Sequence, residues 1–175
     1  MLERSPRPDR LRTLTVPPHV AHPARACGVG RYAGSLGFRP VNADLARAFL
    51  REHHRGVLAT VRSDGRPQMS AVLVGVDEDG YVTISTREAA YKVGHMRRDP
   101  RVSVFVTSED FWKWIQIDGT ATVVSLPDAM EPLVDYYRSV TGEHPDWDDY
   151  RRSMKEQRRV IVRIDIERAG PDHRR

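Results

Sequence analysis

Short apolar segments separated by polar turns recur along the chain from Val41 onward. Runs of about four to eight residues rich in Val, Ile and Thr predict β-strands, and Gly, Asp and Pro between them predict turns. Turns are expected at Ser63–Gly65 and Asp77–Gly80. The predicted strands are Val57–Arg62, Pro67–Val76, Tyr81–Thr86, Val102–Val106, Phe111–Val124 and Val160–Ile166.

Other segments have the apolar spacing of helices. Asn42 is a suitable N-cap for a helix that turns Leu45, Phe49 and Leu50 inward and ends near His53. Two further helices are predicted at Pro127–Val140 and Asp146–Glu156.

A short basic helix is predicted directly after the third strand. Ser85 followed by Glu88 has the form of a capping box, which places the helix start near Thr86. A helix N-terminus presents unpaired backbone N–H groups and a partial positive charge, so it suits a phosphate. Arg87 and Lys92 add full positive charges at the same end. This helix is therefore the strongest candidate for an anion site.

Residue types alone leave the role of Lys92 open. Ala89, Val93 and Met96 form the apolar stripe of this helix, and Lys92 falls at its edge. On residue types alone, that position favours a solvated lysine. Likewise, Cys27 and the arginines after the helix carry no catalytic pattern of their own.

Alternation places other candidate side chains on common faces of predicted strands. Arg66, Gln68 and Ser70 fall on one face of the second strand, where they could line a cofactor. Trp112 and Trp114 fall on one face of the long fifth strand. Two aromatic side chains there could pack in a core or an interface, or could wall a flat heterocycle.

The order of elements favours a mainly β fold with a few helices, of the α+β class. Many antiparallel strands and few helices are typical of a small barrel, whereas a doubly wound sheet would alternate strand and helix. At 175 residues the chain has room for one such domain. Dinucleotide, P-loop and nucleophile-elbow motifs are absent from the sequence, so three common enzyme classes lack support.

The net charge of +4 is unevenly distributed. Residues 1–40 hold seven arginines against Glu3 and Asp9, a charge of +5, so the remainder has 21 basic and 22 acidic residues, or −1. We expect a disordered Pro/Arg-rich leader over 1–40, a cofactor-binding domain over 41–168 and a flexible tail over 169–175. A domain without its own excess of basic residues is not expected to bind nucleic acid.

Composition also indicates the compartment and argues against a metal site. Cys27 is the only cysteine, which precludes an internal disulfide and fits the reducing cytoplasm. No apolar run reaches the roughly 18 residues of a membrane span, so no membrane is expected as a partner. His53–His54 lacks a matching ligand, and Asp146–Asp149 lacks the spacing of a calcium loop.

Several short sequence motifs, taken in their order and spacing, resemble those of one protein family. The chain is similar between Gly56 and Val162 to the split β-barrel oxidoreductases of the pyridoxamine 5′-phosphate oxidase type, in particular to the branch that uses the deazaflavin coenzyme F420. At Ala90 the chain departs from the family, whose members often carry a second basic residue there. The matching segments are Gly56–Thr60, Asp64–Ser70, Lys92, Arg97–Arg101, Gly119–Ala121, and Tyr137–Arg138 through Gly142–Tyr150.

The resemblance implies a homodimeric split β-barrel with a cofactor at the subunit interface. Lys92 is then a phosphate contact, and Arg87 is a candidate to replace the basic residue missing at Ala90. No residue is assigned as catalytic, and the proton donor stays open. The cofactor-binding residues that the resemblance and the strand pattern together suggest are Arg66, Gln68, Ser85, Thr86, Tyr91, Lys92, Trp112 and Trp114.

The function implied is an F420-dependent oxidoreductase that transfers hydride to an electron-poor small molecule such as an enone or a quinone. In such chemistry the cofactor makes the bond, and the protein binds, orients and excludes water. The sequence has no obvious catalytic dyad, which agrees with a protein that leaves the bond-making to its cofactor. Alternatives are an FMN-dependent oxidase or reductase of the same fold, a non-catalytic protein for cofactor storage or sensing, and a barrel kept only for association.

Overall fold

The structure, a computed structural model, describes residues 42–170. The expected leader over 1–40 and the end of the expected tail lie outside the described residues. A single antiparallel sheet of seven strands dominates the described part, in the order β2-β1-β5-β6-β7-β4-β3. The strands are β1 Arg55–Val61, β2 Pro67–Leu73, β3 Gly75–Val76, β4 Val82–Arg87, β5 Arg101–Thr107, β6 Trp114–Val124 and β7 Arg159–Ala169.

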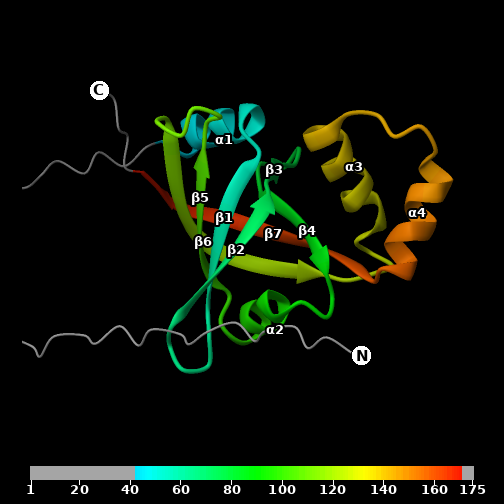
Figure 1. Ribbon diagram of the computed structural model, residues 1–175, viewed down its shortest axis with the longest axis horizontal. Coiled ribbons are helices and arrows are strands. Elements are labelled where there is room, and N and C mark those ends of the chain that lie inside the picture. The colour runs from blue at the N-terminus through cyan, green and yellow to red at the C-terminus, as the bar shows by residue number, and fades with distance from the viewer. Residues whose placement is uncertain (1–41, 171–175) are drawn as a thin grey trace, which may run out of the picture. The chain divides into compact units, whose positions relative to one another are not determined.

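The sheet curls until strands far apart in its order approach each other. In Figure 1 the strands twist around a common interior, and β2 comes close to β4. Antiparallel strands reduce their unpaired edges by such closure. The expectation of a mainly β, barrel-like fold with a few helices is therefore confirmed.

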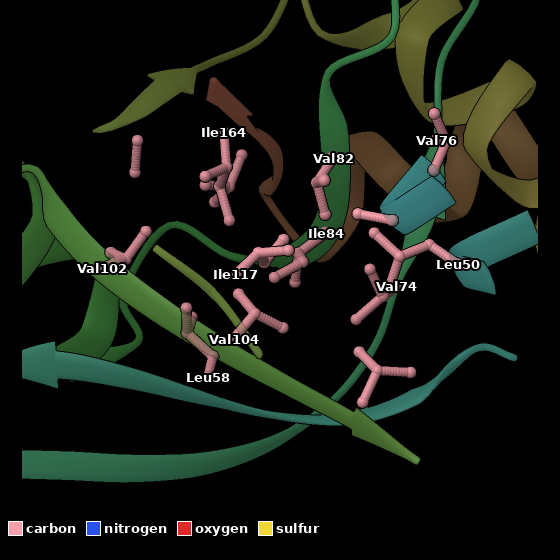
Figure 2. Packing of buried hydrophobic residues seen from close by; sticks show 14 of the residues in the cluster. Leu50, Leu58, Val74, Val76, Val82, Ile84, Val102, Val104, Ile117 and Ile164 are labelled. Atoms are coloured by element: carbon pink, nitrogen blue, oxygen red, sulfur yellow. The ribbon is translucent and has the colours of Figure 1, made fainter. Parts of the chain in front are cut away.

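The inner face of the curled sheet forms the main core. Leu58 on β1 pairs with Val104 on β5, and Val104 pairs with Ile117 on β6, so all three side chains point the same way. They are at most 1% exposed and meet Ile84 and Ile164 from the other half of the sheet (Figure 2). Burial of side chains of this size contributes about 1.5–3 kcal/mol each relative to exposure.

Helix α1 (Ala43–Glu52) covers one end of this core. Asn42 is its N-cap, and its side chain accepts a hydrogen bond from the Asp44 N–H, as the sequence predicts. Leu50 is fully buried, but Leu45 is 54% exposed. The inward orientation predicted for Leu45 is wrong, because Ala46 and Leu50 occupy the buried stripe of the helix instead.

Helix α2 (Tyr91–Arg98) starts later than the sequence predicts. Strand β4 continues through Arg87, because its residues pair with β7 as far as Arg159. The expected capping box at Ser85 and Glu88 is not formed, and Ala90 is an N-cap without a side-chain hydrogen bond. Strand pairing thus overrides the local capping signal.

A second, smaller core lies on the outer face of β7. Helices α3 (Met130–Thr141) and α4 (Trp147–Glu156) pack together beside the ends of β4 and β7 (Figure 1). Leu133 and Val134 of α3 and Ile161 of β7 are fully buried there. None of the helices in the described range is long and apolar enough to cross a membrane.

Candidate functional site

Three cationic side chains gather where β4 ends and α2 begins. Arg87, the last residue of β4, lies directly opposite Arg159, the first residue of β7. Lys92 follows in the first turn of α2 and is half-buried. Burial lowers the pKa of the Lys92 ammonium, and the charge of Arg159 nearby lowers it further. Like charges placed directly opposite each other destabilise a sheet, so this basic end of β4 is suited to an anionic ligand.

The carboxylate that follows Arg87 in the chain is already paired with another arginine. Glu88 forms an ion pair with Arg97 and accepts a hydrogen bond from the Ser125 hydroxyl at 3.0 Å. The Arg97 hydrogen bond is the main cause of the lowered pKa of Glu88. None of the ion pairs found among the described residues joins a carboxylate to Arg87, Lys92 or Arg159.

A phosphate fits the chemistry of this basic end. Arginine presents several N–H donors in a planar fork, and lysine provides a compact charge, so together they suit a phosphate group. The start of α2 adds unpaired backbone N–H groups. Sequence reasoning identified Arg87 and Lys92 but missed Arg159. The Arg158–Arg159 pair directly before the last predicted strand was the available signal.

Ser85 and Thr86, both predicted to bind cofactor, face opposite sides of β4. Thr86 is 7% exposed and pairs with Val160. Ser85 pairs with Ile161, whose side chain packs against α3 and α4. Adjacent residues of a strand alternate between faces, so one cofactor cannot be lined by both side chains in the same way.

Arg66 and Gln68 have different surroundings. The Arg66 guanidinium donates to the Asp64 carboxylate at 2.8 and 3.0 Å within the β1–β2 turn, and it is largely exposed. Gln68 lies opposite Thr60, which is 1% exposed. The Thr60 hydroxyl is 3.1 Å from Nδ1 of His95 on α2. Gln68 and α2 thus lie along the same inner side of β1, whereas Arg66 is held at the turn.

The two predicted tryptophan contacts are not on one strand face. Strand β6 begins at Trp114, and Trp112 belongs to the preceding bend, where Phe111 has a φ of 69°. Trp112 is 77% exposed. Trp114 is half-buried against Phe105, with ring centroids 5.2 Å apart. The prediction of a shared strand face is therefore wrong, because the positive φ of Phe111 interrupts the strand before Trp114.

The tryptophans also lie far from α2 within one chain. His95 of α2 contacts Thr60, and Thr60 pairs with Val102 near the start of β5. Trp114 pairs with Thr107 at the other end of β5. Five strand steps separate these positions, or roughly 17 Å.

The outer face of β2 exposes apolar side chains. Met69 and Leu73 on β2 are 60% and 48% exposed. Met69 pairs with Ala59 of β1, so its side chain shares the outer face with those of Phe105 and Trp114. Contiguous exposed apolar residues on a small protein commonly mark an interaction surface.

The fold is that of a small antiparallel β-barrel with a few helices, and comparison with known proteins identifies the family. Residues 43–171 match the family described as pyridoxamine 5′-phosphate oxidase. The chain belongs to this family, and the expected split β-barrel is confirmed.

Individual relatives agree with this assignment. An F420H(2)-dependent biliverdin reductase of Mycobacterium tuberculosis (strain CDC 1551 / Oshkosh) is 28% identical over 127 residues, which are 72% of this chain and 85% of the relative. The crystal structure of the conserved hypothetical protein Rv2991 from M. tuberculosis has a TM-score of 0.65 at 27% identity, covering 79% of this chain and 89% of that chain. A structure of an F420 reductase has a TM-score of 0.56 at 20% identity, covering 71% and 94%, and shows the shared fold.

Proposed function

We propose that this protein is an oxidoreductase that uses reduced coenzyme F420 to reduce an electron-poor small molecule. The observation that carries the proposal is the basic end of β4, where none of the ion pairs found within residues 42–170 joins a carboxylate to Arg87, Lys92 or Arg159. The similarity to an F420H(2)-dependent biliverdin reductase supports the deazaflavin as the cofactor. When bound, this cofactor supplies the hydride.

The residues of the chain bind and orient the cofactor. Lys92 and Arg159 hold its phosphate, and Arg159 takes the place of the basic residue missing at Ala90. Gln68 contributes polar contacts along the inner side of β1. Tyr91, which is 82% exposed at the start of α2, offers an aromatic face to the cofactor or the acceptor. Ser85, Thr86 and Arg66 stay as secondary candidates because of their different orientations.

A homodimer completes the proposed site. The open apolar face with Met69 and Leu73 is the surface that a second copy would cover. Trp112 and Trp114 are too far from Lys92 to wall the same short pocket within one chain, so the second copy would supply them. Sedimentation velocity at micromolar concentration should give a dimer. A monomer that still binds cofactor would contradict this arrangement.

Titration with F420 and with FMN tests the cofactor. Both carry a phosphate, so the basic end of β4 fits either, and their relative affinity separates the two functions. We expect micromolar or tighter binding of F420 and a colourless purified protein. Tightly retained FMN, seen as a yellow protein, would favour the flavin enzyme instead.

Turnover separates an enzyme from a storage or sensing protein. Oxidation of reduced F420 is followed with a panel of acceptors that includes biliverdin, a quinone and an enone. Acceptor-dependent oxidation supports the reductase. Tight cofactor binding without turnover of any acceptor would indicate the non-catalytic alternative.

A further inference from the structure

A pocket of about 570 Å³ lies at the opposite end of β4 from the basic residues. The β3–β4 turn forms one side, and α3 forms the other. Val76, Pro132 and the ring of Tyr136 supply apolar walls. The Tyr136 hydroxyl donates to the Leu73 carbonyl at 2.9 Å, which fixes the ring in place. The volume is within the usual range for small-molecule sites, about 300–1,000 Å³.

An unsatisfied hydroxyl lies in the lining of this pocket. Thr83 is 3% exposed, and its Oγ1 has no hydrogen-bond partner in the part of the chain that the structure describes. Oγ1 of Thr83 and Oγ of Ser139, which also lines the pocket, each lie 2.9 Å from the point where a Cβ on Gly75 would be. A buried polar group without a partner costs free energy. A ligand that donates a hydrogen bond to Thr83 Oγ1 reduces that cost.

The first arginine of the pocket is occupied by its own carboxylates. Arg163 donates to Asp77 at 2.8 Å and to Asp79 at 2.7 Å. Its guanidinium also stacks over the Tyr81 ring, 4.1 Å from the centroid. These contacts hold Arg163 in the wall and leave little of its charge for a ligand.

The second arginine is occupied as well. Arg138 is 3.6 Å from Asp135 and 3.3 Å from Glu143, and it lies over the Trp147 ring. Glu78 lines the pocket without an ion pair among those found in residues 42–170. The lining thus has a net charge of −2, since four carboxylates face two guanidinium groups. These charged residues are Asp77, Glu78, Asp79, Asp135, Arg138 and Arg163.

We propose that this pocket binds a small organic cation that carries a primary ammonium group on an alkyl chain. The excess of carboxylates attracts the ammonium group. Thr83 Oγ1 provides an acceptor that no other group within residues 42–170 uses. Val76, Pro132 and Tyr136 accommodate the carbon chain. The site is separate from the proposed cofactor site and does not depend on it.

Isothermal titration with 1,4-diaminobutane tests the proposal. Wild-type protein should bind it, while the neutral isostere 1,4-butanediol should not bind. Thr83→Val keeps the shape of the side chain and removes the hydroxyl, so the affinity should fall about tenfold. Asp135→Asn removes a mostly exposed charge, so the affinity should fall about two- to fivefold.

Controls separate a specific site from general attraction to an acidic surface. Glu109→Gln changes an exposed carboxylate in the distant β5–β6 bend and should leave diamine affinity unchanged. A melting curve and an F420 titration establish that Thr83→Val is folded and keeps its cofactor site. The proposal is wrong if wild-type protein binds no diamine, if Thr83→Val binds it as tightly as wild type, or if Glu109→Gln weakens binding as much as Asp135→Asn.

Discussion

The two ends of β4 carry opposite charge, and the same strand pair builds both. At one end, Arg87 lies opposite Arg159 with Lys92 close by, and no ion pair to a carboxylate is found for them in the described part of the chain. At the other end, Thr83 lies opposite Arg163, which is held by Asp77 and Asp79. Arginine at the second end is part of the scaffold, whereas at the first its charge is available to a ligand.

Arg159 and Arg163 make the comparison direct. They lie four residues apart on β7, and alternation places them on the same face of the strand. Only their neighbours differ. Whether an arginine stabilises the fold or serves a ligand is decided by the carboxylates that the fold brings to it. Four experiments test the two ends of β4 and their surroundings.

The largest effect is expected for Lys92→Ala at the basic end. Loss of a charge-assisted phosphate contact, worth about 1.5–3 kcal/mol, should weaken F420 binding by about one to two orders of magnitude. The fold should persist, because alanine is a better helix former than lysine. Fluorescence titration measures the affinity, with Lys155→Ala in α4 as the matched control. Equal affinities for Lys92→Ala and wild type would mean that the lysine is merely solvated.

Arg163→Met and Arg159→Met form a matched pair for stability. Arg163→Met leaves Asp77 and Asp79 without their cation and should lower the free energy of unfolding by about 2 kcal/mol. Arg159→Met relieves repulsion from Arg87 and should leave that free energy unchanged or raise it by about 0.5 kcal/mol. Urea denaturation without ligand measures both. Similar losses in the two variants would remove the distinction between the ends of β4.

Thr83→Val should stabilise the ligand-free protein slightly. Its hydroxyl is buried and finds no hydrogen-bond partner in the described residues, so replacing it with a methyl group should raise the free energy of unfolding by about 1 kcal/mol. Thr60→Val is the control, since Thr60 is also buried but bonds to His95. That variant should lose about 1 kcal/mol. Destabilisation by Thr83→Val would show that its hydroxyl has a partner in solution.

The smallest effect concerns acid stability at the C-terminal end of α2. Hydrogen bonds from the Arg101 side chain lower the pKa of Asp99 from 3.8 to about 2. The folded protein therefore holds the Asp99 proton less tightly than the unfolded chain. This contribution to stability is complete above about pH 4 and is lost as the pH falls toward 2. In urea melts, Asp99→Asn should flatten this pH dependence. Identical slopes for Asp99→Asn and wild type would contradict the assignment.

Local sequence patterns predicted the elements better than their ends. Asn42 caps α1 as expected. The turns expected at Ser63–Gly65 and Asp77–Gly80 each lie directly before a strand region. The capping box at Ser85 failed, because pairing of β4 with β7 uses those residues. The long strand expected from Phe111 begins only at Trp114, since no local pattern signals the positive φ of Phe111.

Part of the candidate site could also be predicted from the sequence. Lys92 and Arg87 stand close together in the chain, so a charge pattern could find them. Arg159 is more than sixty residues further on, and only the β4–β7 register brings it to Arg87. The acidic pocket was missed for the same reason, because its carboxylates come from the β3–β4 turn and from α3.

The sequence by itself determined the strand-rich fold, the basic helix and the resemblance to the pyridoxamine 5′-phosphate oxidase family. These depend on short periods, local turn residues and the order of motifs, all of which act within a few positions of the chain. Tertiary structure alone decided which charges are paired and which are free. Charge pairing depends on distances across strands, and the register that sets those distances follows from burial of Ile84, Val162 and the rest of the inner face.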